Sequence, residues 1–236
     1  MFIASFPAGP WQTNCYVVAT GAGEECLIVD PGMDAGPTVA DVVAEHRLKP
    51  VAVLLTHGHL DHTFSVTPLC ADYASSAWIH SFDRELLIDP LKAMSNDTAQ
   101  LLAQLGLPET MAEPDDVHEL TDGVQVSLAG IDFRVDHAPG HTKGSVLFRS
   151  PYAADDDVAE VVFSGDVLFA GSIGRTDLPG GNPADMLESL RTKVATLPDS
   201  AVVLPGHGPQ TTIAQERATN PYLQPGYLVS GDRSSL

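Results

Sequence analysis

Cysteine is scarce in this sequence of 236 residues. There are three, Cys15, Cys26 and Cys70, and no two of them have the Cys-x-x-Cys spacing. An odd number of cysteines without paired spacing argues against a disulfide framework and against a structural zinc cluster built on thiolates. We therefore predict three buried, reduced thiols.

Basic residues are also few. The 12 Lys and Arg stand against 31 Asp and Glu, which gives a formal net charge of −19. A surface of this sign repels phosphate backbones and anionic lipid headgroups. We therefore expect no nucleic-acid partner and no membrane partner, and we take the excess of carboxylates as a contribution to solubility.

Long apolar runs are absent as well. No stretch approaches the ~18 consecutive apolar residues that can span a bilayer. Residues 1–10 lack the basic segment and the apolar run of a secretory signal. Hydrophobic residues still make up 44% of the sequence, which is typical of a globular protein. We expect a soluble cytoplasmic protein with one substantial core, in a single domain.

Segments typical of strands and of helices alternate along the chain. The residues Val39, Val42, Val43 and His46 repeat at i, i+3, i+4 and i+7 and predict a helix. A second helix is predicted over 183–197, because proline suits its first position and another proline follows its end. Apolar strands are predicted at residues 15–19, 25–29, 51–55, 124–128, 132–135, 146–148, 161–163 and 201–204. The class is therefore α/β with at least eight strands, and the leucine-, proline- and acid-rich segment 83–120 is predicted to be a surface insertion.

The most informative segment is Thr56-His-Gly-His-Leu-Asp-His62, which directly follows an apolar strand. In extended backbone His57 and His59 point to the same side, and a turn would let Asp61 and His62 face the same point. Three imidazoles and one carboxylate this close together are compensated most simply by a divalent cation. The segment predicts a metal-binding loop; the alternative is a polar loop with solvated histidines.

Three later segments share one pattern, in which an apolar strand is followed by a glycine and then by a ligand-type residue. They end at Pro-Gly-His141, Ser-Gly-Asp166 and Pro-Gly-His207. Because open α/β architectures build their sites beyond the carboxyl ends of strands, we expect these residues to meet the histidine-rich loop. Five histidines and two aspartates exceed what one tetrahedral zinc uses. We therefore predict two divalent metal ions that share one carboxylate, zinc in the first place, with iron and manganese as alternatives.

Two further residues are candidates to orient the ligands by hydrogen bonding. Asp30 lies at a strand end in Val-Asp-Pro-Gly, and His137 precedes His141 by four residues. Outer hydrogen bonds of this kind fix the tautomer and the orientation of metal-binding side chains.

The order His-x-His-x-Asp-His, Pro-Gly-His-Thr, Ser-Gly-Asp and Pro-Gly-His-Gly resembles the metallo-β-lactamase superfamily over nearly the whole chain. The resemblance implies a single domain over 1–236, folded as a four-layer αββα sandwich with a binuclear metal site at one edge. Within the superfamily the sequence is similar to the short single-domain form of glyoxalase II, a group of hydroxyacyl-thiol hydrolases. The resemblance implies one metal held by His57, His59 and His141, a second held by Asp61, His62 and His207, and Asp166 as the bridging ligand.

The segment after the bridging aspartate concerns the substrate. In Gly-Ser-Ile-Gly-Arg175-Thr-Asp177, Arg175 matches the region where long glyoxalase II enzymes carry a basic residue for glutathione. The alternative is an arginine that Asp177 holds to shape the loop. Asp177 and Pro209 stand where the long enzymes have tyrosines, and their helical C-terminal domain has no counterpart in the short segment after His207. The hydrolytic core is thus intact, while most of the glutathione-binding side chains are replaced.

The predicted function is hydrolysis of a small-molecule hydroxyacyl thioester, such as an S-lactoyl thiol, to lactate and thiol. We expect attack by a metal-bridging hydroxide that Asp61 orients. A thiol has a pKa near ~8.5, so the thiolate leaves without a strong general acid.

The main alternative is a persulfide dioxygenase with one iron, because those relatives share Gly-Arg-Thr-Asp. A further alternative is a metal-binding scaffold without turnover. A β-lactamase is disfavoured by Asp166, where several such enzymes have cysteine, and a nuclease by the net charge.

Overall fold

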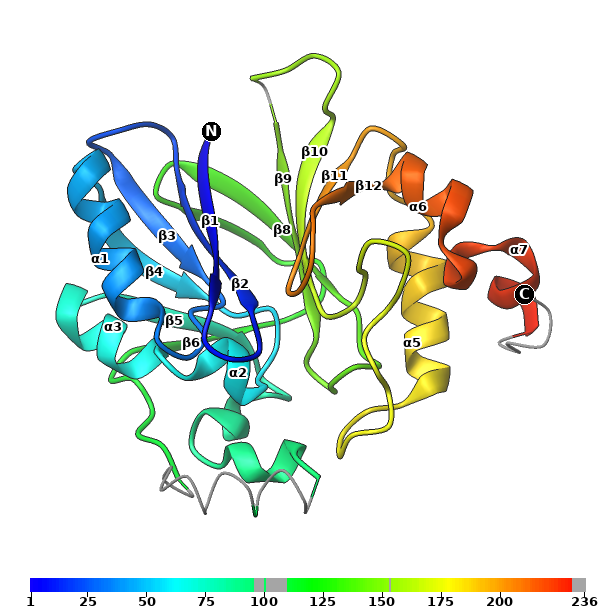
Figure 1. Ribbon diagram of the computed structural model, residues 1–236, viewed down its shortest axis with the longest axis horizontal. Helices are drawn as coiled ribbons and strands as arrows, with labels where there is room; N and C mark the ends of the chain where they lie inside the picture. The colour runs from blue at the N-terminus through cyan, green and yellow to red at the C-terminus, as the bar shows by residue number, and fades with distance from the viewer. Residues whose placement is uncertain (96–99, 101–109, 153, 231–236) are drawn as a thin grey trace.

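The computed structural model describes residues 1–95, 100, 110–152 and 154–230 (Figure 1). Two six-stranded sheets lie in the middle of the molecule, and helices cover their outer faces. The strand orders are β1-β2-β3-β4-β5-β6 and β12-β11-β10-β9-β8-β7. Helices α1 and α3 cover the first sheet, and α5 and α6 cover the second. The predicted α/β class and four-layer αββα sandwich are confirmed.

The first sheet contains β1 (Phe2–Ala8), β2 (Thr13–Ala19), β3 (Glu25–Val29), β4 (Lys49–Leu54), β5 (Ser76–His80) and β6 (Val117–Leu120). The second contains β7 (Gln125–Leu128), β8 (Ile131–His137), β9 (Val146–Pro151), β10 (Glu160–Gly165), β11 (Val202–Pro205) and β12 (Thr211–Thr212). Strands β3 to β6 run parallel, as do β10 and β11, and the other neighbours are antiparallel. All eight predicted strands are present.

The helices are α1 (Ala35–His46), α2 (Leu60–Thr63), α3 (Val66–Tyr73), α5 (Pro183–Ser189), α6 (Ile213–Thr219) and α7 (Pro225–Ser230). Short turns of other helix types are η1 (Arg84–Leu87), η2 (Pro90–Ala93), η3 (Leu190–Val194) and η4 (Pro221–Leu223). The side chain of Asn182 caps α5 by accepting from two backbone N–H groups, and Pro183 occupies the first turn, as predicted. Within the described ranges, no helix has the length and apolar character needed to cross a bilayer.

Apolar side chains form three hydrophobic clusters, one between the two sheets and one between each sheet and its helices. The largest cluster lies between the sheets and includes Leu27, Leu54, Phe133 and Phe148. One outer cluster packs α1 and α3 on the first sheet, and the other packs α5 and η3 on the second. The three cysteines are free and buried, as predicted. Burial raises the pKa of Cys26 to about 12 and that of Cys70 to about 11, so these thiols stay protonated at neutral pH.

Segment 83–120 is only partly the surface insertion that the sequence predicts. Its last four residues form β6, the edge strand of the first sheet, and Leu120 packs into the cluster between the sheets. At the other end, Asp83 is buried. The insertion is therefore shorter than predicted, because both ends contribute to the interior. The predicted helical stretch around residues 101–105 lies outside the described residues.

Two histidines stack where β5 and β8 end. The ring centroids of His80 and His137 are 4.0 Å apart and the ring planes differ by 8°. Burial, with a smaller contribution from the charge of His137, lowers the pKa of His80 to about 4. A buried histidine of this kind makes the folded state bind its proton more weakly than the unfolded chain does.

We expect His80 to destabilise the protein in acid. An unfolded histidine titrates near 6.5, so between this pH and about pH 4 the unfolded state holds a proton that the folded state lacks, and stability falls as the pH falls. In His80→Gln, the decrease in the free energy of unfolding between about pH 7 and pH 4.5 should be smaller than in the wild type by up to about 2 kcal/mol. Urea unfolding at both pH values measures it. His118→Gln, at an exposed histidine of β6, is the matched control, and an identical pH dependence in wild type and His80→Gln would contradict the assignment.

Candidate metal centre

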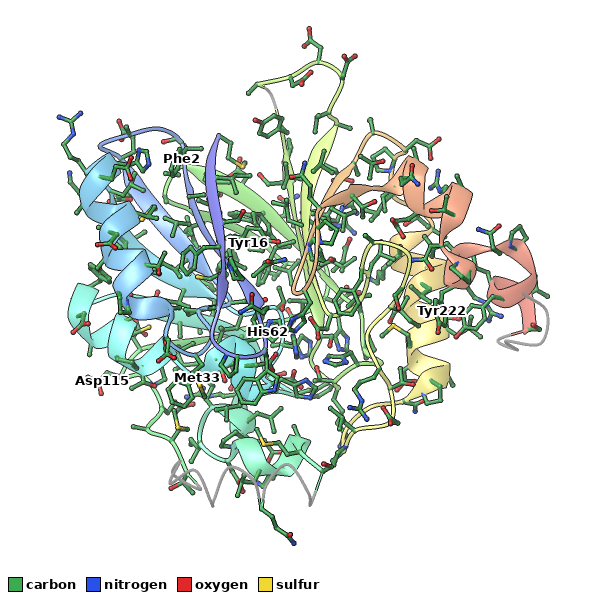
Figure 2. The ribbon with its side chains drawn as sticks, in the orientation of Figure 1. Phe2, Tyr16, Met33, His62, Asp115 and Tyr222 are labelled. Carbon is green, nitrogen blue, oxygen red and sulfur yellow. The ribbon has the colours of Figure 1, made fainter. Side chains whose placement is uncertain are left out.

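All seven predicted ligand residues meet at one end of the two sheets. Figure 2 shows His62 near the centre of the molecule, where the two halves meet. Ligand atoms lie within 4.8 Å of one another in three overlapping groups, which are His57, His59 and His141; His57, His62 and Asp166; and Asp61, His62 and His207. Each group takes two residues from the segment that follows β4 and one residue from a loop of the second sheet. The cluster is suited to two metal ions.

Asp30 orients two of the imidazoles from beneath. Its Oδ2 atom lies 3.0 Å from Nδ1 of His62, so this nitrogen carries the hydrogen and donates it to the carboxylate. The hydroxyl of Thr56 donates to the same oxygen at 2.6 Å and therefore accepts from Nδ1 of His57 at 3.1 Å. In both rings Nε2 is the atom left to bind a cation. Asp30 thus takes the orienting position that the sequence predicts for it.

A backbone carbonyl orients the imidazole of His141 in the same way. Nδ1 of His141 donates to the carbonyl oxygen of Arg175 at 2.7 Å. His137 does not take part in this arrangement, because its Nε2 atom bonds to the carbonyl oxygen of Lys143 at 2.8 Å and its ring stacks on His80. The structure therefore does not support the predicted orienting role of His137; the carbonyl of Arg175 holds the ring of His141.

Five buried polar atoms of the cluster have no hydrogen-bond partner among the described residues. They are the Nε2 atoms of His57, His59, His62 and His141 and the Oδ1 atom of Asp166. Each unpaired buried polar group costs about 1–3 kcal/mol. Because imidazole nitrogens and carboxylate oxygens are good ligands for first-row divalent ions, bound cations would compensate all five atoms at once. The residues present therefore fit a binuclear metal centre.

Asp166 faces both sides of the cluster. Its Oδ1 atom lies 3.4 Å from Nε2 of His62, while its Oδ2 atom lies 3.4 Å from Nε2 of His141 and 3.6 Å from Nε2 of His207. The carboxylate thus lies between histidines of both proposed ligand groups, as a shared ligand would.

Burial keeps two of the histidines neutral. It lowers the pKa of His59 to about 3 and holds the pKa of His57 well below its ordinary value, and the neighbouring imidazoles add to the effect. Neutral imidazole is the form that binds metal.

Around His62, carboxylates and an imidazole lie close together and stabilise one another's charged forms. Burial opposes a charged His62, yet Asp61, Asp166 and Asp30 outweigh burial and raise the pKa of His62 well above its ordinary value. Burial alone would raise the pKa values of Asp61 and Asp166, but the charge of His62 outweighs it and holds both below their ordinary range. The carboxylates are therefore ionised, and a cation that binds here replaces a proton.

Residues of β2 hold the ligand loops of both sheets. The hydroxyl of Thr13 donates to Oδ2 of Asp61 at 3.1 Å, and that oxygen lies 3.2 Å from Nε2 of His207. The hydroxyl of Tyr16 donates to the carbonyl oxygen of Pro205 at 2.7 Å, directly before the glycine and His207. No local sequence pattern marks Thr13 and Tyr16 as supporting residues, because their partners lie far along the chain.

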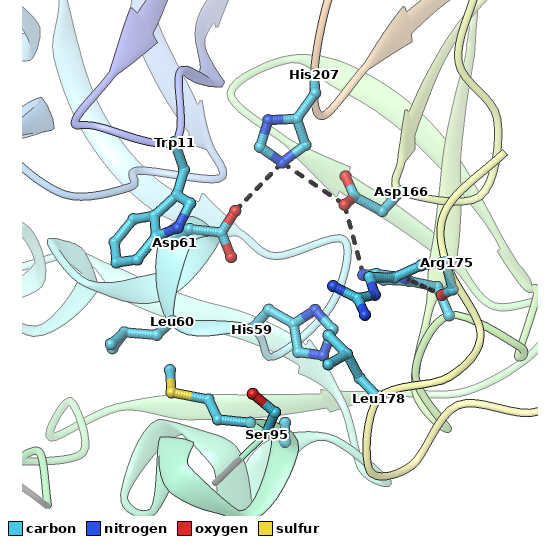
Figure 3. A pocket seen from close by; sticks show the side chains of 12 residues that line it. Trp11, His59, Leu60, Asp61, Ser95, Asp166, Arg175, Leu178 and His207 are labelled. Atoms are coloured by element: carbon cyan, nitrogen blue, oxygen red, sulfur yellow. Dashed lines mark hydrogen bonds and ion pairs between the residues drawn. The ribbon is translucent and has the colours of Figure 1, made fainter. Parts of the chain in front are cut away.

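A cavity of about 260 Å³ opens over the cluster (Figure 3). Ligand-type side chains form its floor, and its walls include Trp11, Leu60, Met94 and Leu178. Arg175 also lines the cavity, but Nε and one terminal nitrogen donate to the carboxylate of Asp177 at 2.7 and 2.8 Å. Of the two interpretations of this arginine, the contacts agree with an arginine held by Asp177. The cavity is small and mostly apolar around a polar floor.

The chain matches one protein family over most of its length. A family model described as Metallo-beta-lactamase superfamily matches residues 8–207. An uncharacterized protein of Mycobacterium tuberculosis is 45% identical over 225 residues, which are 95% of this chain and 98% of that protein. The probable metallo-hydrolase YqgX of Bacillus subtilis is 36% identical, over 92% of this chain and 95% of that protein. The hydroxyacylglutathione hydrolase GloC of Haemophilus influenzae is 33% identical, over 94% of this chain and 98% of that protein.

Solved structures agree with these matches. A crystal structure described as BLEG-1 B3 metallo-beta-lactamase has a TM-score of 0.80 at 39% identity and covers 94% of this chain and 100% of that one. TTHA1623 in a di-iron-bound form has a TM-score of 0.72 at 37% identity with the same coverage. ETHE1 from Myxococcus xanthus, with a TM-score of 0.74 at 23% identity over 100% of this chain and 88% of that one, shares the fold.

Proposed function

Because the chain belongs to the metallo-beta-lactamase superfamily, we propose that it is a metal-dependent hydrolase of hydroxyacyl thioesters, acting on an S-lactoyl thiol or a close analogue. The observation that carries the proposal is the group of seven ligand-type side chains, in which five buried atoms have no hydrogen-bond partner among the described residues and five of the side chains line a small cavity. The similarity to a relative named hydroxyacylglutathione hydrolase supports the thioester as substrate.

In this proposal the seven side chains bind two metal ions. One ion would be held by His57, His59 and His141 and a second by Asp61, His62 and His207, with Asp166 shared between them. Divalent ions bound here would supply hydroxide at neutral pH by lowering the pKa of water and would polarise a carbonyl group. The solved relative in a di-iron-bound form supports two ions, and zinc, iron and manganese all accept these ligand types.

The remaining steps depend on the chain itself. Asp61 lies at the cavity floor, where Thr13 fixes its Oδ2 atom, so its carboxylate can accept a hydrogen bond from the attacking water and orient it toward the thioester carbonyl. Trp11 and Leu178 line the cavity, whose volume of about 260 Å³ has room for a short acyl group. The bond from carbonyl carbon to sulfur then breaks, and the thiolate leaves without a strong general acid, because its conjugate acid has a pKa near ~8.5.

A thioester panel tests the function. S-lactoyl esters of several thiols would be offered to purified protein of measured metal content, and we expect hydrolysis of at least one that stops on chelation and returns when metal is added back. Oxygen uptake with a persulfide and no thioester hydrolysis would instead support the dioxygenase alternative. A metal-loaded protein that hydrolyses no thioester, lactone or phosphodiester would support the alternative of a metal-binding scaffold without turnover.

The ion pair between Arg175 and Asp177 leads to a prediction about the thiol carrier. An anionic carrier such as glutathione must compete with Asp177 for the guanidinium at the cavity edge. In Asp177→Asn we expect kcat/KM for S-lactoylglutathione to rise about 3- to 5-fold, mainly through a lower KM, whereas the S-lactoyl ester of the neutral mercaptoethanol should not change.

Steady-state kinetics with both substrates measure this effect. Asp185→Asn is the matched control, because it removes the same charge from an exposed carboxylate of α5 that does not line the cavity. Equal changes for both substrates, or a gain in the control, would contradict a role of the ion pair in selecting the carrier.

A further inference from the structure

Asp83 is a buried carboxylate that lies beside the metal centre without belonging to it. It follows β5 in a tight turn, and 1% of its surface is exposed. Its Oδ2 atom accepts from the backbone N–H of Gly58 at 2.9 Å and from the hydroxyl of Thr142 at 2.6 Å. Its Oδ1 atom accepts from the backbone N–H of Gly144 at 2.7 Å. Both oxygens are thus used, and all three donors come from other loops.

The donors come from the loop of His57 to His62 and from the loop of His141, and two of them directly adjoin the ligands of one group. Gly58 lies between His57 and His59, and Thr142 directly follows His141. The contact with each loop is close, since a Cβ atom on Gly58 would lie 2.9 Å from the carbonyl oxygen of Asp83. A Cβ atom on Gly144 would lie 2.6 Å from Cγ of Asp83. Asp83 therefore joins the loop of the first sheet to the loop of the second at one side of the cluster.

The other side of the cluster is held by other residues. Asp30 contacts His62 directly, and through Thr56 it also reaches His57, which belongs to the first group. Asp61 is fixed by Thr13, and the loop before His207 is fixed by Tyr16. Every hydrogen bond that the described residues make to the carboxylate of Asp83 comes from the loops of the first group.

We infer that Asp83 is a positioning residue for one of the two metal ions, the ion at His57, His59 and His141, and that the other ion does not depend on it. The inference rests on the proposed metal centre but not on the identity of the substrate. Residues that orient metal ligands typically change metal affinity about 10- to 100-fold when they are replaced. The effect of Asp83 should be largest at this ion, because Gly58 and Thr142 adjoin its ligands, whereas none of the three donors adjoins Asp61, His62 or His207.

Asparagine is the informative replacement. Its single acceptor oxygen cannot serve three donors on two sides, and its NH₂ group would face a backbone N–H. In Asp83→Asn we expect the number of ions retained after dialysis to fall from about two to about one. Titration with a competing chelator should show one affinity reduced about 10- to 100-fold and the other unchanged. Cobalt substitution gives a second readout, because the absorption of only one of the two ions should be lost.

Two further variants make the result decisive. Thr142→Val removes one of the three hydrogen bonds to Asp83 and should reduce the affinity for the same ion by about 3- to 10-fold. Asp136→Asn is the matched control, because Asp136 is a buried carboxylate whose partners are Arg134 and Arg149, and it should lower stability without changing metal content.

The inference is overturned if Asp83→Asn binds both ions with wild-type affinity, or if it loses both in parallel. If Asp83→Asn does not fold, unchanged affinities in Thr142→Val overturn it. A wild-type protein that binds no metal would instead reject the proposed function itself.

Discussion

Replacing Asp166 with alanine should reduce kcat for the thioester by about 1,000-fold or more, which is about 4 kcal/mol in the activation free energy. The reason is the position of this carboxylate. Its Oδ1 atom lies 3.4 Å from Nε2 of His62, and its Oδ2 atom lies 3.4 Å from Nε2 of His141 and 3.6 Å from Nε2 of His207, so the carboxylate lies between ligands of both proposed ions. Without it, the two ions have no common ligand and do not act on one water molecule.

The measurement is kcat on variant and wild-type protein whose metal content has been determined. Asp136→Asn serves as the control for loss of a buried carboxylate away from the cluster. Turnover near the wild-type value in Asp166→Ala would reject the shared-ligand role, whatever the metal content.

Removal of the metal should have the second large effect, on stability as well as on activity. Five buried atoms would lose the cations that compensate them, and each buried polar atom left without a partner costs about 1–3 kcal/mol. An ion present at about 100 times its Kd stabilises the folded state by about 2.7 kcal/mol, so we expect chelation to lower Tm by about 5–11 °C. Activity should be lost in parallel.

Thermal unfolding with and without chelator measures the shift, and adding back zinc, iron or manganese separately shows which ion restores it. The shift should be smaller in acid, because a bound cation replaces the proton of His62, whose pKa is raised well above its ordinary value. Unchanged Tm and unchanged turnover after complete removal of metal would exclude a resident metal centre.

The parts of the site that the sequence predicts are those with a local pattern. An apolar strand followed by glycine and a ligand-type residue occurs before His141, Asp166 and His207, and the structure brings these residues to the segment of His57 to His62. Asp30 also has a local pattern, since it ends a buried strand and is followed by proline and glycine.

Residues whose role depends on distant partners could not be found in this way. Asp83 lies in an ordinary polar turn of the sequence, and its three donors come from residues 58, 142 and 144. Strand β6 has no local pattern, because it has four residues with His118 and Glu119 in the middle, and its pairing with β5 joins segments far apart in the sequence. Whether Arg175 turns to Asp177 or to the cavity depends on the loop conformation, which the spacing of the two residues does not determine.

The division of ligands between the two halves has a consequence for how the protein comes apart. Each ligand group combines two side chains that follow β4 with one that follows a strand of the second sheet, so neither half retains a complete group when the sheets separate. Bound ions would therefore couple ion release to separation of the two sheets, and they would act as a non-covalent cross-link whose strength depends on the ambient metal concentration. Resistance to proteolysis and to heat would then depend on the metal concentration of the surrounding solution as well as on the polypeptide.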